Sequence, residues 1–344
     1  GGLVVSNLGA CALFAAMSGS SPATCAAIGK MGIPEMRKRN FPDGVAAGSI
    51  AAGGTLGILI PPSITMIVYG IATETSIGRL FLAGVLPGLL LVSLFMAWSI
   101  YATWREGGID ALAGRTFTWK EKFEVLPRVI PFLLVILGVL YALYGGVATP
   151  SETAAVGALL CLGLAIIIYR MTDLSLVWVM LRDATKESVM ILFIIGAAGV
   201  FSYMLSSLFI TQAIAEWIGT LDVNRWVLML YVNVFLLVAG FFLPPVAVIL
   251  MAAPILMPII LGAGFDPYWF AVVLTINMEI GLISPPVGLN LYVINGIAPE
   301  IPLKTILKGS LPYVACMVVA ILILCLFPGI ATWLPDVLMG TAVS

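Results

Sequence analysis

Two stretches of sequence decide the fold: "GGTLGILIPPS" at residues 53–63 and "MEIGLISPPVG" at residues 278–288. Each lies inside an apolar run long enough to cross a bilayer, which takes about 20 helical residues. Each also carries glycines and an adjacent proline pair, and proline interrupts a helix because it lacks the backbone donor and clashes with the preceding turn. A break at this depth is tolerated only where the freed backbone groups face protein or a cavity. The two stretches therefore predict two broken transmembrane helices.

The composition is that of a polytopic membrane protein. The 344 residues are 61% hydrophobic and only 10% charged, with a mean hydropathy of +1.14, whereas a soluble domain has about 25% charged residues. The net charge of −1 provides no basic surface for nucleic acid, so no nucleic-acid partner is expected. Histidine is absent, which excludes histidine-dependent catalysis and histidine metal sites. We expect no enzymatic activity and no cofactor.

The rest of the chain alternates apolar runs with short polar loops. Residues 3–34 hold two half-length apolar pieces around "SGSSPAT" (18–24), which predicts a re-entrant helical hairpin or, as the alternative, one kinked spanning helix. Residues 226–262 repeat this pattern around "GFFLPPVAV" (240–248). Broken helices are expected over 44–72 and 268–298. Full spans are expected over 80–103, 129–148, 153–169, 188–209 and 311–334, with interfacial pieces at 173–187 and 211–225.

The two broken helices belong to a repeat. Aligning the first proline of each pair gives an offset of 285 − 61 = 224 residues, at which Gly57 meets Gly281 and Thr55 meets Glu279. Each copy contains a hairpin, a loop, a broken helix and a span. Two breaks and two hairpin tips supply backbone carbonyls for cations and helix N-termini for an anion.

Charge predicts the orientation of the copies. If the first hairpin opens to the cytoplasm, all Lys and Arg residues except Arg79 and Arg225 face the cytoplasm, as the positive-inside rule requires. The second hairpin then enters from the outside, so the repeat is inverted. Inverted repeats with broken helices meeting near the midplane are the architecture of secondary transporters. The expected fold class is an all-α polytopic membrane protein, an inverted-repeat elevator transporter with two re-entrant hairpins and two broken transmembrane helices.

Three motifs carry a resemblance to a known family: "MSGSSPATCAAIGKMGIPEM" (17–36), "AAGGTLGILIPPSI" (51–64) and "NMEIGLISPPVGLNLYV" (277–293). With them, essentially the whole chain resembles the large membrane (M) subunit of tripartite ATP-independent periplasmic (TRAP) transporters, the DctM-like subunit. The resemblance implies sodium-driven import of organic acids by an elevator movement in the bacterial inner membrane. It also implies two partners, a small four-helix membrane subunit and a periplasmic substrate-binding protein. Members are usually longer at the N-terminus, so one or more leading helices are expected to be missing.

The resemblance also implies a division into moving and fixed parts. Residues 1–72 form the first repeat of a transport domain, and residues 226–298 form its second repeat. Residues 73–225 are scaffold helices with an interfacial segment, and residues 299–344 form a C-terminal scaffold helix.

Sodium is a hard cation that prefers oxygen ligands, and by analogy with the family two or more ions bind at the tips and breaks. We expect one site to join the first tip to the first break, and the other to join the second tip to the second break. The candidates are Ser18, Gly19, Ser20, Ser21, Thr24, Gly54, Thr55 and Gly57 for the first site, and Pro244, Pro245, Glu279, Gly281, Ser284 and Asn290 for the second.

Glu279 is the one acidic residue expected near the midplane. An intramembrane carboxyl group is a functional candidate by default. It either ligates sodium, carries a coupled proton, caps the following half-helix, or is simply a buried carboxyl hydrogen-bonded to the opposite break.

The substrate anion has no Lys or Arg near the midplane to bind it, so helix N-termini, hydroxyls and amides are expected to hold it, with a sodium ion beside it. The candidate substrate-binding residues are Asn7, Ser20, Ser21, Pro62, Thr65, Asn277, Ser284, Pro286 and Asn290.

Other functions fit the residues less well. A stand-alone ion-coupled carboxylate carrier of a related elevator family is distinguished mainly by the sequences of its motifs. An intramembrane protease acting through "SGSS" lacks a histidine or a nearby lysine as base. A passive channel does not explain two inverted hairpins, which favour alternating access.

Overall fold

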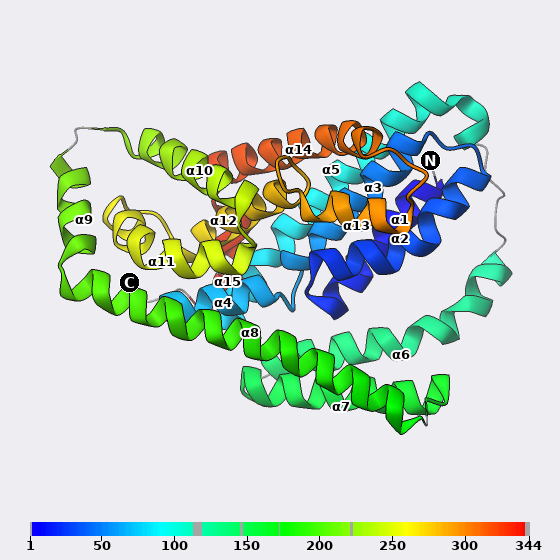
Figure 1. The fold of residues 1–344 in the computed structure, drawn as a ribbon, viewed down its shortest axis with the longest axis horizontal. Helices are drawn as coiled ribbons and strands as arrows, with labels where there is room; N and C mark the ends of the chain where they lie inside the picture. The colour runs from blue at the N-terminus through cyan, green and yellow to red at the C-terminus, as the bar shows by residue number, and fades with distance from the viewer. Residues whose placement is uncertain (1, 113–118, 145–146, 172, 221–222, 341–344) are drawn as a thin grey trace. The chain divides into compact units, whose positions relative to one another are not determined.

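The computed structural model describes residues 2–112, 119–144, 147–171, 173–220 and 223–340, and these residues are helical, with no strand among them (Figure 1). They divide into two compact units, residues 1–114 with 198–344 and residues 115–197. The helices are α1 Gly2–Ser18, α2 Ser21–Lys38, α3 Asp43–Thr55, α4 Ile64–Thr73, α5 Ile77–Leu112, α6 Trp119–Tyr144, α7 Pro150–Tyr169, α8 Leu174–Ser207, α9 Ile210–Thr220, α10 Arg225–Phe242, α11 Pro245–Gly262, α12 Pro267–Leu282, α13 Leu289–Ile297, α14 Leu303–Leu326 and α15 Gly329–Met339.

Six helices in the described part of the chain are long and apolar enough to cross a bilayer. They are α5, α7, α8, α10, α11 and α14. The expectation of an all-α, multi-pass membrane protein is therefore confirmed. The re-entrant path of the hairpins through a bilayer stays a prediction.

Both predicted breaks occur at the proline pairs. In the first, α3 ends at Thr55, a 3₁₀ turn covers Leu56–Ile58, and α4 begins at Ile64. In the second, α12 ends at Leu282, residues 283–288 are irregular, and α13 begins at Leu289. The peptide bond within each proline pair is cis.

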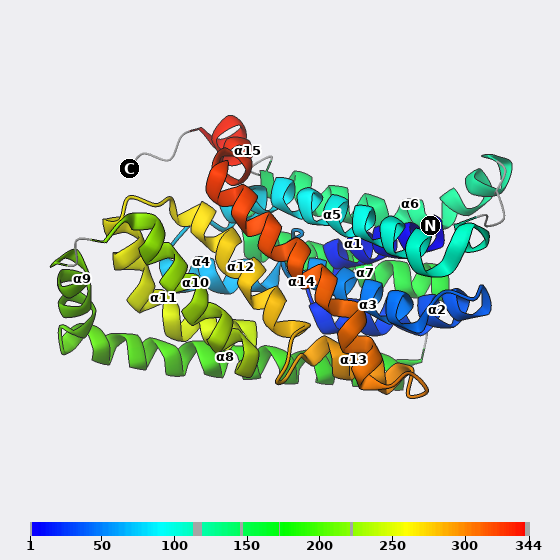
Figure 2. The same cartoon turned by 90° about the horizontal axis from the view of Figure 1, so that it is seen from above.

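The two repeats interlock inside the first unit. Helix α13, which follows the second break, packs against α2 of the first hairpin. Helix α4, which follows the first break, packs against α11 of the second hairpin (Figure 1; Figure 2). Each half-helix therefore completes the hairpin of the opposite repeat, an arrangement that the linear sequence does not reveal.

Two expected boundaries differ from the structure. The expected interfacial piece (173–187) and the following span (188–209) form one continuous helix, α8, because no proline interrupts residues 174–207. The expected final span (311–334) is instead two helices, α14 and α15, because Phe327 leaves the helical conformation immediately before Pro328.

In the second unit, α6 packs against α7. Helix α7 begins with a capping box, in which the Thr149 hydroxyl accepts a hydrogen bond from the Glu152 backbone and the Glu152 carboxylate accepts one from the Thr149 backbone. Such a cap satisfies backbone donors at the helix start. None of the predicted site residues lies in this unit.

Candidate functional site

The first hairpin turns within two residues, shorter than the polar tip that the sequence predicts. Gly19 adopts a left-handed conformation with φ of +58°, which glycine reaches without a steric penalty. The Thr24 hydroxyl donates to the Ser20 carbonyl at 2.8 Å and lies 3.0 Å from the Ser18 hydroxyl. The tip is therefore a compact group of hydroxyl and carbonyl oxygens.

This tip lies directly against the first break. A Cβ atom at residue 57 would lie 2.8 Å from the Ser20 carbonyl oxygen, and one at residue 19 would lie 2.8 Å from the Pro62 carbonyl oxygen. Only glycine allows backbone to approach backbone this closely. Gly57 and Gly19 thus let the backbone of the tip lie directly against the backbone of the break.

The helix before the break contributes two further candidates. A Cβ atom at Gly54 would overlap the Cys25 sulfur and lie 3.1 Å from the Ser21 carbonyl oxygen, so Gly54 also contacts the tip. Thr55 is fully buried, and its hydroxyl donates to the Ala52 carbonyl at 2.6 Å within its own helix. The hydroxyl oxygen of Thr55 keeps a lone pair available to a cation.

Asn290 joins the first group, whereas the sequence assigned it to the second. Its amide nitrogen donates to the Ser21 hydroxyl at 2.8 Å and to the Ala51 carbonyl at 3.2 Å. The reason is the interlock, because α13 carries Asn290 onto α2 and α3. Repeat alignment matches positions along the chain and does not show which copy a half-helix packs against.

The second break is only partly covered by its own hairpin. Gly281 meets the Gly240 carbonyl near the end of α10, so these two backbones also approach at a glycine. Ser284 is 5% exposed, whereas Pro285 and Pro286 are exposed, as is Pro244 at the second tip. Pro245 begins α11 and is half-buried. The first break is thus closed and the second open on one side.

Asn277 and Glu279 are buried on α12. The Asn277 amide donates to the Val273 carbonyl at 2.9 Å and to the side-chain oxygen of Asn233 on α10. Sequence reasoning missed Asn233, although an amide inside an otherwise apolar helix was an available signal. Both carboxyl oxygens of Glu279 lack a hydrogen-bond partner among the described residues, so the bond to the opposite break, one of the four alternatives for this residue, is not formed.

Two further predicted substrate residues lie on α1 and α4, outside the tip itself. Asn7 is in the middle of α1, where it packs against Gly32 of α2, more than two helical turns before the tip. Thr65 is buried in the first turn of α4. Ser63, which the sequence analysis did not single out, caps this helix by accepting a hydrogen bond from the Met66 backbone at 3.2 Å. A serine before an apolar run is the signal for such a cap.

Three side chains between residues 277 and 290 carry buried oxygens without a donor. The side-chain oxygens of Asn277, Glu279 and Asn290 have no hydrogen-bond partner in the described chain. An unpaired buried acceptor costs about 1–3 kcal/mol, and a bound cation satisfies such atoms. Hydroxyl, amide and carbonyl oxygens suit a hard cation, and no group of three or more potential Cys, Asp or Glu metal ligands occurs among the described residues.

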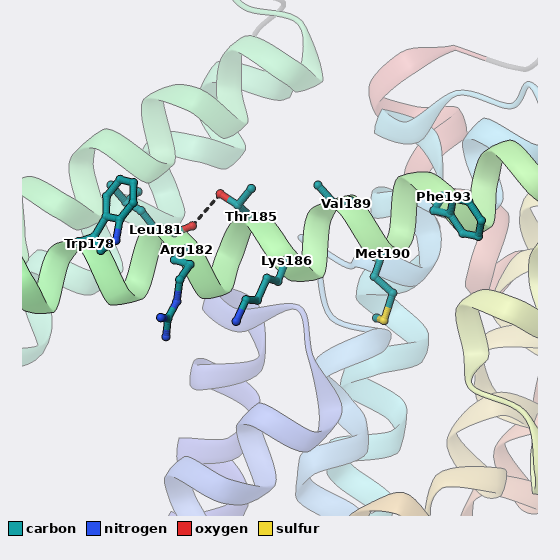
Figure 3. A pocket seen from close by; sticks show the side chains of 8 residues that line it. All are labelled: Trp178, Leu181, Arg182, Thr185, Lys186, Val189, Met190 and Phe193. Atoms are coloured by element: carbon teal, nitrogen blue, oxygen red, sulfur yellow. Dashed lines mark hydrogen bonds between the residues drawn. The ribbon is translucent and has the colours of Figure 1, made fainter.

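A further hollow lies along α8. It measures about 620 Å³ and is lined by side chains of α8 alone, from Trp178 to Phe193 (Figure 3). Arg182 and Lys186 on its edge are exposed, and each lies within 4.0 Å of Asp183. A single helix cannot enclose a small ligand, so this surface is not a candidate substrate site.

Comparison with known proteins identifies the family. The profile of the family described as "Tripartite ATP-independent periplasmic transporter, DctM component" matches residues 1–330. The chain is 41% identical over 336 residues to the C4-dicarboxylate TRAP transporter large permease protein DctM of Pseudomonas aeruginosa, covering 98% of this chain and 78% of that protein.

Two further relatives agree. The protein of the same description from Vibrio cholerae is 40% identical, over 99% of this chain and 79% of that protein. The isethionate TRAP transporter permease protein DctMQ of Oleidesulfovibrio alaskensis is 34% identical, over 96% of this chain and 52% of that protein. The chain therefore belongs to the DctM family, the large permease component of tripartite ATP-independent periplasmic transporters.

Proposed function

We propose that this permease imports an organic acid anion together with sodium, by an elevator movement in the bacterial inner membrane. A periplasmic binding protein delivers the substrate, and a small membrane subunit completes the permease. Membership of the family supports this function, and so does the relative DctMQ, whose name joins the two membrane subunits. The relatives named for C4-dicarboxylates support a dicarboxylate as the substrate class.

One observation carries the proposal: the tip of the first hairpin lies against the first break, and Asn290 from the other repeat connects to both. Ser21 and Asn290 are fully buried, and the free Asn290 oxygen has no donor. A sodium ion held there replaces missing donors and binds both repeats at once. Without the ion, the buried acceptors repel one another and an incoming carboxylate.

Coupling follows from this electrostatic condition. The described residues place no Lys or Arg against the first tip, since Lys30 lies about two turns along α2 and Arg37 and Lys38 lie in its last turn. A substrate carboxylate near the tip therefore gains attraction only after sodium binds. Two ligands that favour each other's binding in this way share a reciprocal coupling free energy.

The elevator proposal rests on the interlock. Residues 1–72 and 226–298 are the proposed transport domain, and α4 and α13 tie its two repeats together. Residues 73–225 and 299–344 are the proposed scaffold. At the contact between α3 and α14, Gly48 meets the Gly309 backbone, and glycines offer no side chains that would resist sliding.

Uptake into proteoliposomes tests the function. The permease is reconstituted with its small subunit and supplied with loaded binding protein, with and without an inward sodium gradient. Uptake that requires both supports the proposal. Uptake without the binding protein favours the stand-alone carrier instead, and uptake driven by a proton gradient alone moves the coupling role to Glu279.

A further inference from the structure

A second cavity lies at one end of the first unit, away from the breaks. It measures about 270 Å³ and lies where the start of α10, the loop between α11 and α12, and helix α15 meet. Figure 2 shows the starts of α10 and α12 at this end. The side chains that matter here are Arg225, Trp226, Phe265, Asp266, Trp269 and Asp336.

Aromatic rings hold the Arg225 side chain in this cavity. Its guanidinium carbon lies 5.3 Å from the centre of the Trp226 ring and 5.7 Å from that of Phe265. Phe265 in turn stacks on buried Trp269, with ring centres 5.2 Å apart. Stacking on aromatic faces fixes a guanidinium without using its hydrogen-bond donors.

The two carboxylates of the cavity already have partners. Asp266 begins α12 and accepts hydrogen bonds from the Tyr268 and Trp269 backbone, both at 2.8 Å. Asp336 pairs with Arg79 at 3.5 Å. Arg225 forms no hydrogen bond or ion pair with any described residue, so it is the group with unused donors.

This end of the unit faces away from the cytoplasm. The opposite end carries Arg37, Lys38, Arg39, Lys304 and Lys308, and Arg37 binds Glu300 there at 2.7 Å. Among the Lys and Arg residues described at the helix ends of the first unit, only Arg79 and Arg225 lie at the cavity end. The positive-inside rule therefore places the cavity on the periplasmic side.

We propose that this cavity is a docking point for the substrate-binding protein, in which Arg225 receives a carboxylate side chain of that partner. This inference rests on the proposed function, which requires a periplasmic partner. The fixed guanidinium offers two parallel donors to a carboxylate. A planar, pre-positioned fork loses little entropy when the partner arrives.

Charge reversal tests the docking point. In nanodiscs that hold the permease and its small subunit, Arg225→Glu is expected to raise the Kd of loaded binding protein about tenfold or more, since a like charge replaces a partner. Arg225→Lys keeps the charge but loses the two parallel donors, so its Kd is expected to lie between those of the wild type and Arg225→Glu. Lys304→Glu is the matched control, because it reverses an exposed charge at the other end. Melting temperatures check that each variant is folded.

The outcomes separate three cases. A raised Kd with an unchanged sodium requirement for uptake supports docking at Arg225. An unchanged Kd overturns it. If the KM for substrate rises while the Kd stays unchanged, Arg225 acts on the substrate itself and not on the binding protein. If wild-type uptake needs no binding protein, the proposed function has failed before any variant is compared.

Discussion

At the scale of single residues, the proposed first site depends on the absence of a Cβ atom at residue 57. Gly57 has no Cβ, and a Cβ there would lie 2.8 Å from the Ser20 carbonyl oxygen, a backbone atom that cannot rotate away. We expect Gly57→Ala to destabilise the protein by about 1–3 kcal/mol, as overpacking does, and to abolish uptake. The melting temperature and sodium-driven uptake in proteoliposomes are the measurements.

A second glycine provides the control. Gly296 on α13 has no atom within 4 Å of the position that a Cβ would occupy. Gly296→Ala is expected to keep uptake and to gain up to about 1 kcal/mol of stability, because alanine is the better helix residue. Equal behaviour of the two variants would show that the tip does not need the close approach.

Asn290 was expected at the second break, but it contacts the first hairpin and α3. Asn290→Ala removes the bonds to Ser21 and Ala51, and the loss of about 1–2 kcal/mol predicts a roughly 5- to 30-fold rise in the sodium concentration for half-maximal uptake. Asn295→Ala on the same helix, whose amide bonds only the Ile301 carbonyl, is the control. A normal sodium requirement in Asn290→Ala would remove this residue from the site.

Residue types at the tip could be predicted, but their partners could not. Ser21 and Gly57 follow from the need for oxygens and close backbone approach beside a break. The bond between Asn290 and Ser21 joins residues 269 positions apart, and no local pattern encodes it. Asn7 lies beside Gly32 in the middle of α1, and its substrate role stays a prediction.

At the scale of elements, an ion cluster joins α2, α3 and the segment before α14. Arg37 lies 2.9 Å from Asp43 and 2.7 Å from Glu300. These groups are more than one-third exposed, so each pair is worth only about 0–1 kcal/mol. We expect Arg37→Gln to lower the melting temperature slightly, and concentrated choline chloride to remove the difference by screening.

Arg39→Gln sets the scale for that comparison. Arg39 pairs only with Glu35 of its own helix, at 2.8 Å, and such a pair is worth about 0.3–0.5 kcal/mol. A larger loss in Arg37→Gln would reflect the contact between elements. An identical, salt-independent loss in both variants would mean that the cluster does not hold the elements together.

Helix breaks were predictable where proline marks them, and less so elsewhere. The proline pairs at 61 and 285 located both breaks because proline acts locally. The 173–209 region was divided wrongly, since a change from charged to apolar side chains does not interrupt a backbone. The break before α15 has its own local marker, Pro328, which the hydropathy of the region obscured.

At the scale of the whole molecule, the inverted repeat predicts which ends share a side of the membrane. Helix α14 has 24 residues and crosses once, so its two ends lie on opposite sides. In a variant without native cysteines, we expect Lys304→Cys to react with an impermeant maleimide only in inverted vesicles. Trp333→Cys, beyond the other end, is expected to react only in spheroplasts. Labelling of both from one side would contradict the inverted arrangement.

The repeat itself could be predicted from the sequence, because the two breaks have similar sequence motifs at a constant offset. The interlock could not be predicted, because the packing of each half-helix against the hairpin of the other copy is visible only in three dimensions. Fold class and membrane spans depend on composition and periodicity, whereas the assembly of the site depends on contacts between distant segments.

The interlock also sets the order in which the molecule is completed. During synthesis, Ser21 leaves the ribosome long before Asn290, its partner 269 positions later. Until then, the first hairpin lacks α13, and α4 lacks α11. The N-terminal half must therefore wait in the membrane with an unfinished surface, and such long-range closure is slow. Two separately expressed halves would accordingly associate through the same exchanged half-helices. The chain is thus built like a domain-swapped dimer whose two subunits are covalently joined.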